Sequence, residues 1–238
     1  EMAFNLNDPW SKPNPDNTFE DPFGLATSNP ALSLLEAFGK VPAGTLAVQK
    51  DGEAAKINSI DTKGEFFIFT AIPKVTAGTL FNGKFEVDMM NTLNSTKFGE
   101  ICTFKPSRFS FEYKYTPGDV YYKTVIDGKE VSGVEVPGVK DSCSVAAYLY
   151  EVASEKEFLT GVNINTSDKV IATAKLGNGT TQPNFVQTSA DFVYTTPYDA
   201  AKTYKIAIVC SSSAKGDLFE GAPGSALWIK TLTIFSEK

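Results

Sequence analysis

The chain of 238 residues contains no histidine. Imidazole is the side chain that takes and returns a proton near neutral pH in Ser-His-Asp and Cys-His catalysis, and it is also the commonest metal ligand in proteins. These hydrolase classes and histidine-ligated zinc and iron sites are therefore excluded. A catalytic role would have to rest on carboxylates, lysine, tyrosine or an oxygen-ligated metal.

Cysteine is scarce as well. Cys102, Cys143 and Cys210 allow at most one disulfide bond, and no pair of them has the short spacing of a zinc or redox motif. Cys210 shares its parity with the apolar residues of the segment 204–208, so we expect it to be a buried small hydrophobe.

Long apolar runs and an excess of basic charge are missing too. No segment approaches the ~20 apolar residues of a membrane-spanning helix, so none is expected. Residues 1–4 lack the basic-then-apolar pattern of an export signal, which is typical of a mature chain whose signal has been removed. The net charge of −6 argues against non-specific electrostatic binding to the phosphates of nucleic acids, and no nucleic-acid partner is expected.

What the sequence does contain is aromatic alternation, most clearly in residues 105–119. Between Arg108 and Tyr115, polar residues alternate with Phe and Tyr. A period of two places the aromatic side chains on one face of an extended strand and the polar side chains on the other. Pro106 before the strand and the turn at 116–119 after it set its limits. The segment predicts a half-buried antiparallel strand.

Similar short segments fill the chain from residue 45 onward, separated by Gly, Pro, Asn and Asp. The expected strands are 45–49, 65–72, 79–87, 108–115, 120–126, 144–152, 169–173, 191–194, 204–210 and 226–235. Residues 65–70 are apolar without alternation, as in a strand covered on both faces. Strands without intervening helices predict an all-β, antiparallel sandwich, and more specifically a jelly roll.

The organisation of the chain also follows from this pattern. No internal repeat or shift in composition divides it, so residues 1–238 are predicted to form a single domain. Residues 1–44 are rich in proline and turn residues, and they predict an irregular segment packed on that domain. At most one or two short helices are expected, the first within residues 33–38.

The order of several motifs resembles a known family. The motifs are TAGTLFNGKF (76–85), FG (98–99), FKP (104–106), FEYKY (111–115), DSCSVAAYLYEV (141–152), SSS (211–213), GD (216–217) and GSAL (224–227). This ordered set, strongest over residues 76–235, resembles the "putative carbohydrate metabolism domain" family of surface lipoproteins in Bacteroides-type gut bacteria.

The resemblance implies a galactose-binding-like β jelly roll that takes part in glycan capture or utilisation. It implies an extracellular, outer-membrane surface or periplasmic lipoprotein, a glycan or oligosaccharide as ligand, and other surface glycan-utilisation proteins as partners. No cofactor is implied, and only a structural calcium ion is left open. In relatives the last strand tends to carry acidic residues after an apolar pair, whereas here Lys230 and Thr231 follow. That departure puts such a calcium site in doubt.

A sugar site needs flat aromatic faces for the C–H surface and a few fixed polar groups for the hydroxyls. Arg108, Glu112 and Lys114 form a polar row on one strand face, and Tyr122 and Trp228 offer rings. We take these as candidate carbohydrate-binding residues. The plainer interpretations are a solvated outer face for the row and burial in the core for the rings.

Two further candidates lie in the glycine-rich loop of residues 216–225. Asp217 and Glu220 would contact a sugar or a calcium ion there. Turn chemistry explains the same residues, because glycine adopts positive φ cheaply and aspartate bonds the backbone downstream of it. No pair of acidic residues is distinguished as catalytic, and no metal site is assigned.

Three functions remain for the chain. The preferred one is a non-catalytic carbohydrate-binding surface protein. The first alternative is a glycoside hydrolase or lyase, whose two carboxylates would stand about 5.5 Å apart for retention or about 6.5–9.5 Å apart for inversion. The second alternative is a structural or adhesive module that binds another protein, which a broad exposed apolar patch would favour.

Overall fold

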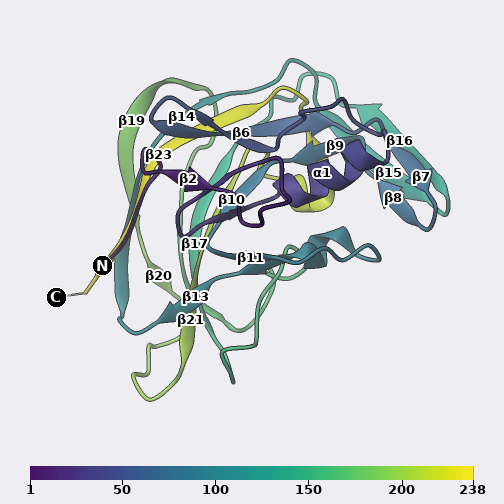
Figure 1. The fold of residues 1–238 in the computed structure, drawn as a ribbon. Coiled ribbons are helices and arrows are strands. Elements are labelled where there is room, and N and C mark those ends of the chain that lie inside the picture. Colours follow the sequence, from purple (N-terminus) through teal and green to yellow (C-terminus); the bar gives the residue numbers. More distant parts are fainter. Residues whose placement is uncertain (238) are drawn as a thin grey trace.

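The computed structural model describes residues 1–237, and it contains two large antiparallel sheets packed face to face (Figure 1). The first sheet has the order β19–β14–β23–β6–β5, with β1 beside β23 and β9 beside β6. Its strands are β1 (Met2–Asn5), β5 (Val48–Asp51), β6 (Ala54–Asp61), β9 (Val75–Ala77), β14 (Pro106–Thr116), β19 (Gln182–Asp191) and β23 (Ala226–Ser236). The all-β antiparallel sandwich is confirmed, and the jelly-roll topology stays a prediction.

The second sheet has the order β20–β18–β17–β21–β10–β4, with β13 beside β21. Its strands are β4 (Ala26–Thr27), β10 (Thr79–Phe81), β13 (Glu100–Cys102), β17 (Ser144–Glu151), β18 (Val170–Lys175), β20 (Val193–Tyr194) and β21 (Tyr204–Ser211).

Smaller elements surround these sheets, and several gather at the end away from the two termini (Figure 1). The helices are α1 (Asn29–Ala37) and the single 3-10 turns η1 (Thr92–Ser95) and η2 (Gly216–Leu218). The short strands are β2 (Trp10–Ser11), β3 (Asp21–Pro22), β7 (Glu65–Phe67), β8 (Thr70–Ile72), β11 (Gly83–Phe85), β12 (Thr96–Phe98), β15 (Tyr122–Asp127), β16 (Glu130–Glu135) and β22 (Glu220–Gly221). They form the hairpins β2–β3, β7–β8, β11–β12 and β15–β16, with β22 beside β15.

The aromatic face of β14 lies in the core between the two sheets, as its alternation predicts. Phe109, Phe111, Tyr113 and Tyr115 are all buried there. The rings of Phe109 and Phe111 lie 4.9 Å apart, and those of Phe111 and Tyr113 lie 5.7 Å apart. Each buried ring of this kind stabilises the fold by about 1.5–3 kcal/mol.

The second sheet is buried on both faces. Along β17 the side chains of Val145 and Leu149 face the core between the sheets, whereas Tyr148 and Tyr150 belong to a separate apolar cluster on the outer face. Segments from β11 to β12 and from 152 to 165 cover this outer face, with Leu159 packed into the cluster. A strand covered on both faces has no polar side to alternate with its apolar one, which explains the run of apolar residues here.

A buried polar cluster lies where β21 ends and β22 leads into β23. The carboxylate of Asp141, which is 3% exposed, accepts hydrogen bonds from the hydroxyls of Ser213 (2.6 Å) and Ser225 (2.8 Å) and from the N–H of Ala222 (2.8 Å). Burial raises the pKa of this carboxyl, and the hydrogen bonds oppose that rise. Gly221 passes so close that a Cβ there would lie 2.4 Å from the Ser213 Oγ.

Two expectations about local structure need correction. The segment 65–72 is not one strand buried on both faces, because Ile68 (φ 57°) turns the chain between β7 and β8 and is 62% exposed. The helix is longer than expected and begins at Asn29, with Pro30 in its first turn. The Asn29 side chain fastens it to the first sheet, donating to the carbonyl of Val48 (2.8 Å) and accepting from its N–H (2.9 Å).

The three cysteines are free and buried, as expected for Cys210. Burial raises the pKa of the Cys143 thiol to about 12. Among residues 1–237 no helix is long and apolar enough to cross a membrane.

Candidate functional site

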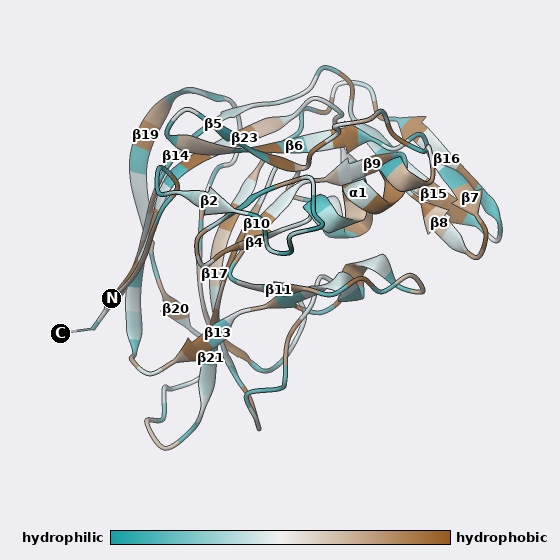
Figure 2. Cartoon of the chain, viewed as in Figure 1, coloured by the Kyte–Doolittle hydropathy of each residue, from teal (hydrophilic) through white to brown (hydrophobic). Residues whose placement is uncertain are grey.

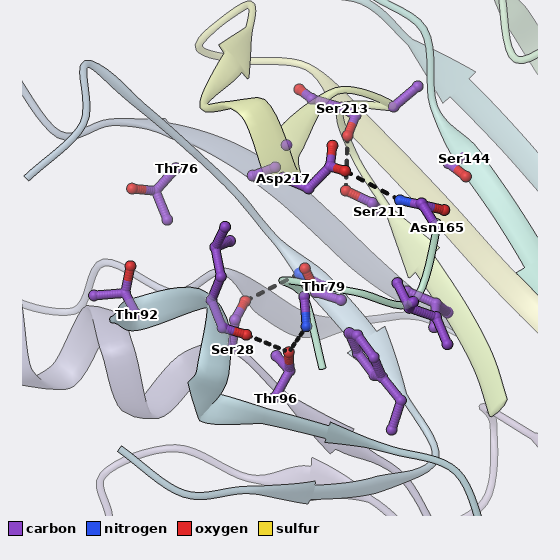
Figure 3. A pocket seen from close by; sticks show the side chains of 18 of the residues that line it. Ser28, Thr76, Thr79, Thr92, Thr96, Ser144, Asn165, Ser211, Ser213 and Asp217 are labelled. Atoms are coloured by element: carbon purple, nitrogen blue, oxygen red, sulfur yellow. Dashed lines mark hydrogen bonds between the residues drawn. The ribbon is translucent and has the colours of Figure 1, made fainter. Parts of the chain in front are cut away.

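The main candidate cavity lies on the outer face of the second sheet and has a volume of about 430 Å³. Its floor is formed by outward-facing residues of β10, β17, β18 and β21. Its walls come from α1, β9, the β11–η1–β12 excursion, the loop at 161–165 and η2 (Figure 3). The site is therefore assembled from segments that lie far apart in the sequence.

A chain of hydrogen bonds crosses one side of this cavity. The Asn165 amide donates to the Asp217 carboxylate (3.1 Å), and the buried Tyr148 hydroxyl donates to the Asn165 carbonyl oxygen (2.8 Å). Burial, with a further contribution from the charge of Asp217, raises the pKa of Tyr148 to about 12. Tyr148 is therefore a neutral hydrogen-bond donor near neutral pH, and Figure 3 shows Asp217 and Asn165 pointing toward each other.

The same side carries the cation of the cavity. The exposed Lys175 places its Nζ 4.9 Å from the centre of the Tyr148 ring. Hydroxyl groups also line the cavity. They belong to Ser28, Thr76, Thr79, Thr92, Thr96, Ser144 and Ser211. A cation, a carboxylate, an amide and several hydroxyls within one concavity supply donors and acceptors for a polyhydroxylated ligand.

Aromatic rings complete the lining. Phe85 and Phe219 stand at one end of the cavity, and both are half-exposed. Phe219 has φ of 55°, a left-handed conformation that costs a non-glycine residue about 1–2 kcal/mol. Its carbonyl accepts hydrogen bonds from the Thr124 hydroxyl (2.8 Å) and N–H (3.2 Å), which hold the strained turn in place.

The structure brings one of the two predicted loop residues into the cavity. Asp217 lines it, whereas Glu220 lies outside and accepts a hydrogen bond from the Tyr121 hydroxyl (3.3 Å). Tyr122 also lies outside the cavity, with the Nζ of Lys74 4.8 Å from its ring centre.

The remaining predicted residues gather on the outer face of the first sheet. Lys114 lies opposite Trp228 on the neighbouring strand, with its Nζ 4.4 Å from the indole ring. Trp228 points away from the core, as its phase relative to its buried neighbours predicts. Glu112 lies 3.9 Å from the Nζ of Lys230, and the Arg108 guanidinium lies over the ring of Phe235. The structure thus brings Lys114 and Trp228 together but keeps both apart from Asp217.

Carboxylates are sparse in the cavities around this site. Two smaller cavities adjoin the first, and within residues 1–237 these three are lined by Asp217, by Asp88 and by no acid, respectively. Among the same residues, no cluster of three or more acidic or cysteine side chains is arranged to hold a metal ion. The calcium expectation thus gains no ligand set in the described chain.

Sequence reasoning missed Tyr148, Asn165 and Lys175. Tyr148 belongs to an apolar run that indicates only a buried strand, and Asn165 belongs to a loop that indicates only a turn. Lys175 is a single charge at the end of β18. Phe219 lies in the glycine-rich loop of residues 216–225, but its φ is visible only in the structure. No local pattern marks these residues because their proximity arises from tertiary structure.

The sequence matches the model of a family described as "Putative carbohydrate metabolism domain" over residues 7–235. The chain belongs to this family. The match extends the expected region of 76–235 toward the N-terminus, so it takes in α1 and three of the four short strands before it, β2, β3 and β4. No curated protein matches this member of the putative carbohydrate metabolism domain family significantly.

Two solved structures share the fold of this putative carbohydrate metabolism domain. A putative glycoside hydrolase from Bacteroides thetaiotaomicron is 24% identical, with a TM-score of 0.77 over 100% of this chain and 72% of the other. A putative glycoside hydrolase from Bacteroides vulgatus is 20% identical, with a TM-score of 0.71 over 99% of this chain and 98% of the other. At these identities the likeness establishes the fold, and the activity named for the two neighbours is theirs.

Proposed function

We propose that this domain binds a glycan without cleaving it, in the cavity on the outer face of the second sheet. The observation that carries the proposal is the composition of that cavity, where aromatic rings stand beside a carboxylate, an amide and a cation. This combination suits sugars, whose rings present apolar C–H faces and a fringe of hydroxyls.

Each lining group has a role that its chemistry allows. The Asp217 carboxylate has acceptor capacity beyond its bond to Asn165, so it accepts from sugar hydroxyls, whereas Lys175 donates to them. Phe85 and Phe219 pack against the C–H face of a sugar ring. The hydrogen bond between Asn165 and Asp217 orients the carboxylate before the ligand arrives, which lowers the entropy that binding costs.

The absence of a second acid in the cavity favours binding over catalysis. Glycoside hydrolysis ordinarily uses two carboxylates on either side of the scissile bond. Among residues 1–237, Asp217 is the single carboxylate of the main cavity, and Asp88 in the adjoining one accepts hydrogen bonds from the N–H groups of Met90 (2.9 Å) and Asn91 (3.0 Å). Hydrolysis by the domain remains the alternative that the experiment has to test.

A second candidate surface for glycan is the outer face of the first sheet. Lys114 and Trp228 form a cation–π pair there, and the Trp228 Nε1–H donates to Asp51 (2.8 Å). An exposed indole with charged neighbours is able to stack a sugar. The face is occupied by its own ion pairs and lines none of the three cavities, which ranks it below the cavity.

We place the domain in the cell envelope, where it would pass captured glycan to other surface glycan-utilisation proteins. Family membership and the Bacteroides origin of the two neighbours support this placement. Fractionation of cells that express the complete protein tests it. Recovery in the cytoplasm alone would contradict the placement.

The binding proposal is tested with plant and host glycans on an array, followed by calorimetry on every glycan retained. Asp217→Asn and Asn165→Ala should weaken binding by about ten- to 150-fold, because a hydrogen bond to a charged group contributes about 1.5–3 kcal/mol. Asp127→Asn, at an exposed hairpin end, is the matched control and should bind as the wild type does.

The outcomes separate the candidates. Loss of binding in Trp228→Ala and Glu112→Gln, with Asp217→Asn unaffected, would move the site to the first sheet. Release of reducing sugar from a retained glycan, abolished by Asp217→Asn, would establish hydrolysis. No binding to any glycan would contradict the proposed function.

A further inference from the structure

An apolar slot adjoins the main cavity, and the two share part of their lining. The slot has a volume of about 110 Å³ and lies between α1, the β7–β8 hairpin and the β11–η1 segment. Phe85 and Phe219 line both spaces, so the same two rings close one end of the polar cavity and open the slot. Beyond these rings the lining changes to Leu34, Phe38, Phe67, Ile72, Val87 and Met89.

The rim of the slot leaves large apolar side chains in water. Phe38 is 42% exposed and Val87 is 53% exposed, and both line the slot. Figure 2 shows hydrophobic segments gathered on β7 and β8 at this end of the molecule. Each exposed Å² of apolar surface costs about 25 cal/mol relative to burial, so an occupant that covers the rim is favoured.

We propose that the glycan ligand of this domain carries an aromatic substituent, whose ring enters the slot while its sugar occupies the main cavity. The inference rests on the proposed function, since it names the class of ligand for the same site. The ligand is an aryl glycoside or a sugar esterified with an aromatic acid.

The size and lining of the slot suit one ring. A cavity of about 150 Å³ lined by Leu, Ile and Phe is large enough to bind benzene, so a slot of comparable size that is open at its mouth accommodates a single ring. Aromatic pairs are favourable with ring centres about 4.5–7 Å apart. Phe38 and Phe67 already form such a pair at 5.2 Å, and the Lys40 Nζ lies 4.3 Å from the centre of the Phe67 ring.

The polarity of the joined spaces explains why ring and sugar belong to one molecule. The polar groups Asp217, Asn165 and Lys175 all line the main cavity and none lines the slot. Among residues 1–237, Asp88 is the one charged residue that lines the slot, and its carboxylate is engaged by the N–H groups of its own turn. A ligand that is polar at one end and apolar at the other matches this division, whereas an unsubstituted sugar leaves the slot unused.

The experiment compares methyl and para-nitrophenyl glycosides of glucose, galactose, mannose, xylose and arabinose by titration calorimetry. The para-nitrophenyl member of a recognised pair should bind about tenfold more tightly than its methyl counterpart, because its ring is removed from water. Released nitrophenol reports hydrolysis in the same samples.

A side chain that fills the slot should remove this difference. In Thr70→Trp the new indole occupies the slot, so the advantage of the aryl glycoside falls to within about twofold while methyl glycoside binding is kept. Val87→Trp, at a lining position that is 53% exposed, repeats the test if Thr70→Trp disturbs the hairpin. Val186→Trp adds the same side chain to β19 in the other sheet and should keep the full advantage.

The results distinguish the inference from the function beneath it. Equal affinity for methyl and aryl glycosides, in a protein that binds oligosaccharides, overturns the inference and leaves the proposed function standing. If para-nitrophenyl glycosides still bind more tightly than methyl glycosides in both slot-filling variants, the aromatic ring binds elsewhere, and this also overturns the inference. A slot that captures a protein rather than an aryl sugar, with no glycan bound in any assay, overturns both.

Discussion

The outer faces of the two sheets differ although both belong to one sandwich. On the first sheet, alternate residues of β14 and β23 reach the surface, where Lys230 of β23 pairs with Glu112 of β14 and with Glu53 of the β5–β6 turn. On the second sheet, six successive residues of β17 are buried, because other segments cover the outer face. The cavity forms on the covered face, where the covering segments leave part of the sheet bare.

The difference shows where a cavity arises in this fold. A face that meets water directly needs only alternation of polar and apolar residues, and here it lines none of the three cavities. A covered face receives walls from loops and short helices, so it is able to surround a ligand and exclude water from it. The strand with the clearest polar pattern, β14, is therefore not one of the strands beneath the main cavity.

If the outer faces of the two sheets differ in this way, truncating an outward-facing side chain should destabilise the protein more on the second sheet than on the first. Tyr150 is fully buried under the covering segments, and its hydroxyl donates to the carbonyl of Phe98 (2.6 Å). Tyr150→Ala should lower the free energy of unfolding by about 3–5 kcal/mol, because it leaves a cavity and an unpaired carbonyl. Lys114→Ala, the control on the other face, should change it by less than about 1 kcal/mol. Urea denaturation measures both, and similar losses would contradict the difference.

A buried acid beside the edge strand β4 of the second sheet adds a test through pH. Asp21 lies beside Thr27 of the second sheet, and burial raises the pKa of its carboxyl to about 6. A carboxyl whose pKa is higher in the folded chain favours folding when protonated, so its contribution is complete below about pH 4 and is lost as the pH rises through about 6.

The measurement for Asp21 is the difference between wild type and Asp21→Asn across this range. The amide mimics the protonated carboxyl and still accepts from the Thr27 hydroxyl, so the variant should lack the pH dependence. At pH 7.5 it should be about 2–3 kcal/mol more stable than the wild type, and near pH 4 the two should agree. A constant difference between the two proteins would show that Asp21 is not the titrating group.

The smallest effect is expected on the open face. Glu112 lies 3.9 Å from Lys230, which also lies 3.3 Å from Glu53. Glu112→Gln should change the free energy of unfolding by less than about 0.5 kcal/mol, since an exposed ion pair is screened and orders two long side chains. Thermal unfolding at low and at high salt measures it. A loss above about 1 kcal/mol that disappears in salt would mean that this face depends on its charges.

The sequence predicts which side chains face the core where polar and apolar residues alternate, because a period of two carries information about burial. The aromatic face of β14 and the outward position of Trp228 are both confirmed on that basis. The segment 65–72 has no such period, and its turn at Ile68 depends on a backbone conformation that its residue type does not signal. The single-domain organisation of residues 1–238 stays a prediction.

The candidate site was predictable only in part. Asp217 is visible as a carboxylate in a glycine-rich loop, but Tyr148, Asn165 and Lys175 are ordinary residues of a strand, a loop and a strand end. What relates them is the path of the chain, which brings segments more than 50 residues apart into contact, as in the bond between Asn165 and Asp217. No spacing rule within one segment encodes that approach.

The walls of the cavity are separate loops above a shared floor of strands, so one wall is able to change without the others. The β11–η1–β12 excursion, the loop at 161–165 and the η2 turn leave from different strands and return to them. Lengthening or replacing one of them would remodel a single side of the opening and leave the packing between the sheets as it is. Relatives that differ in these excursions would then capture different ligands on an unaltered scaffold.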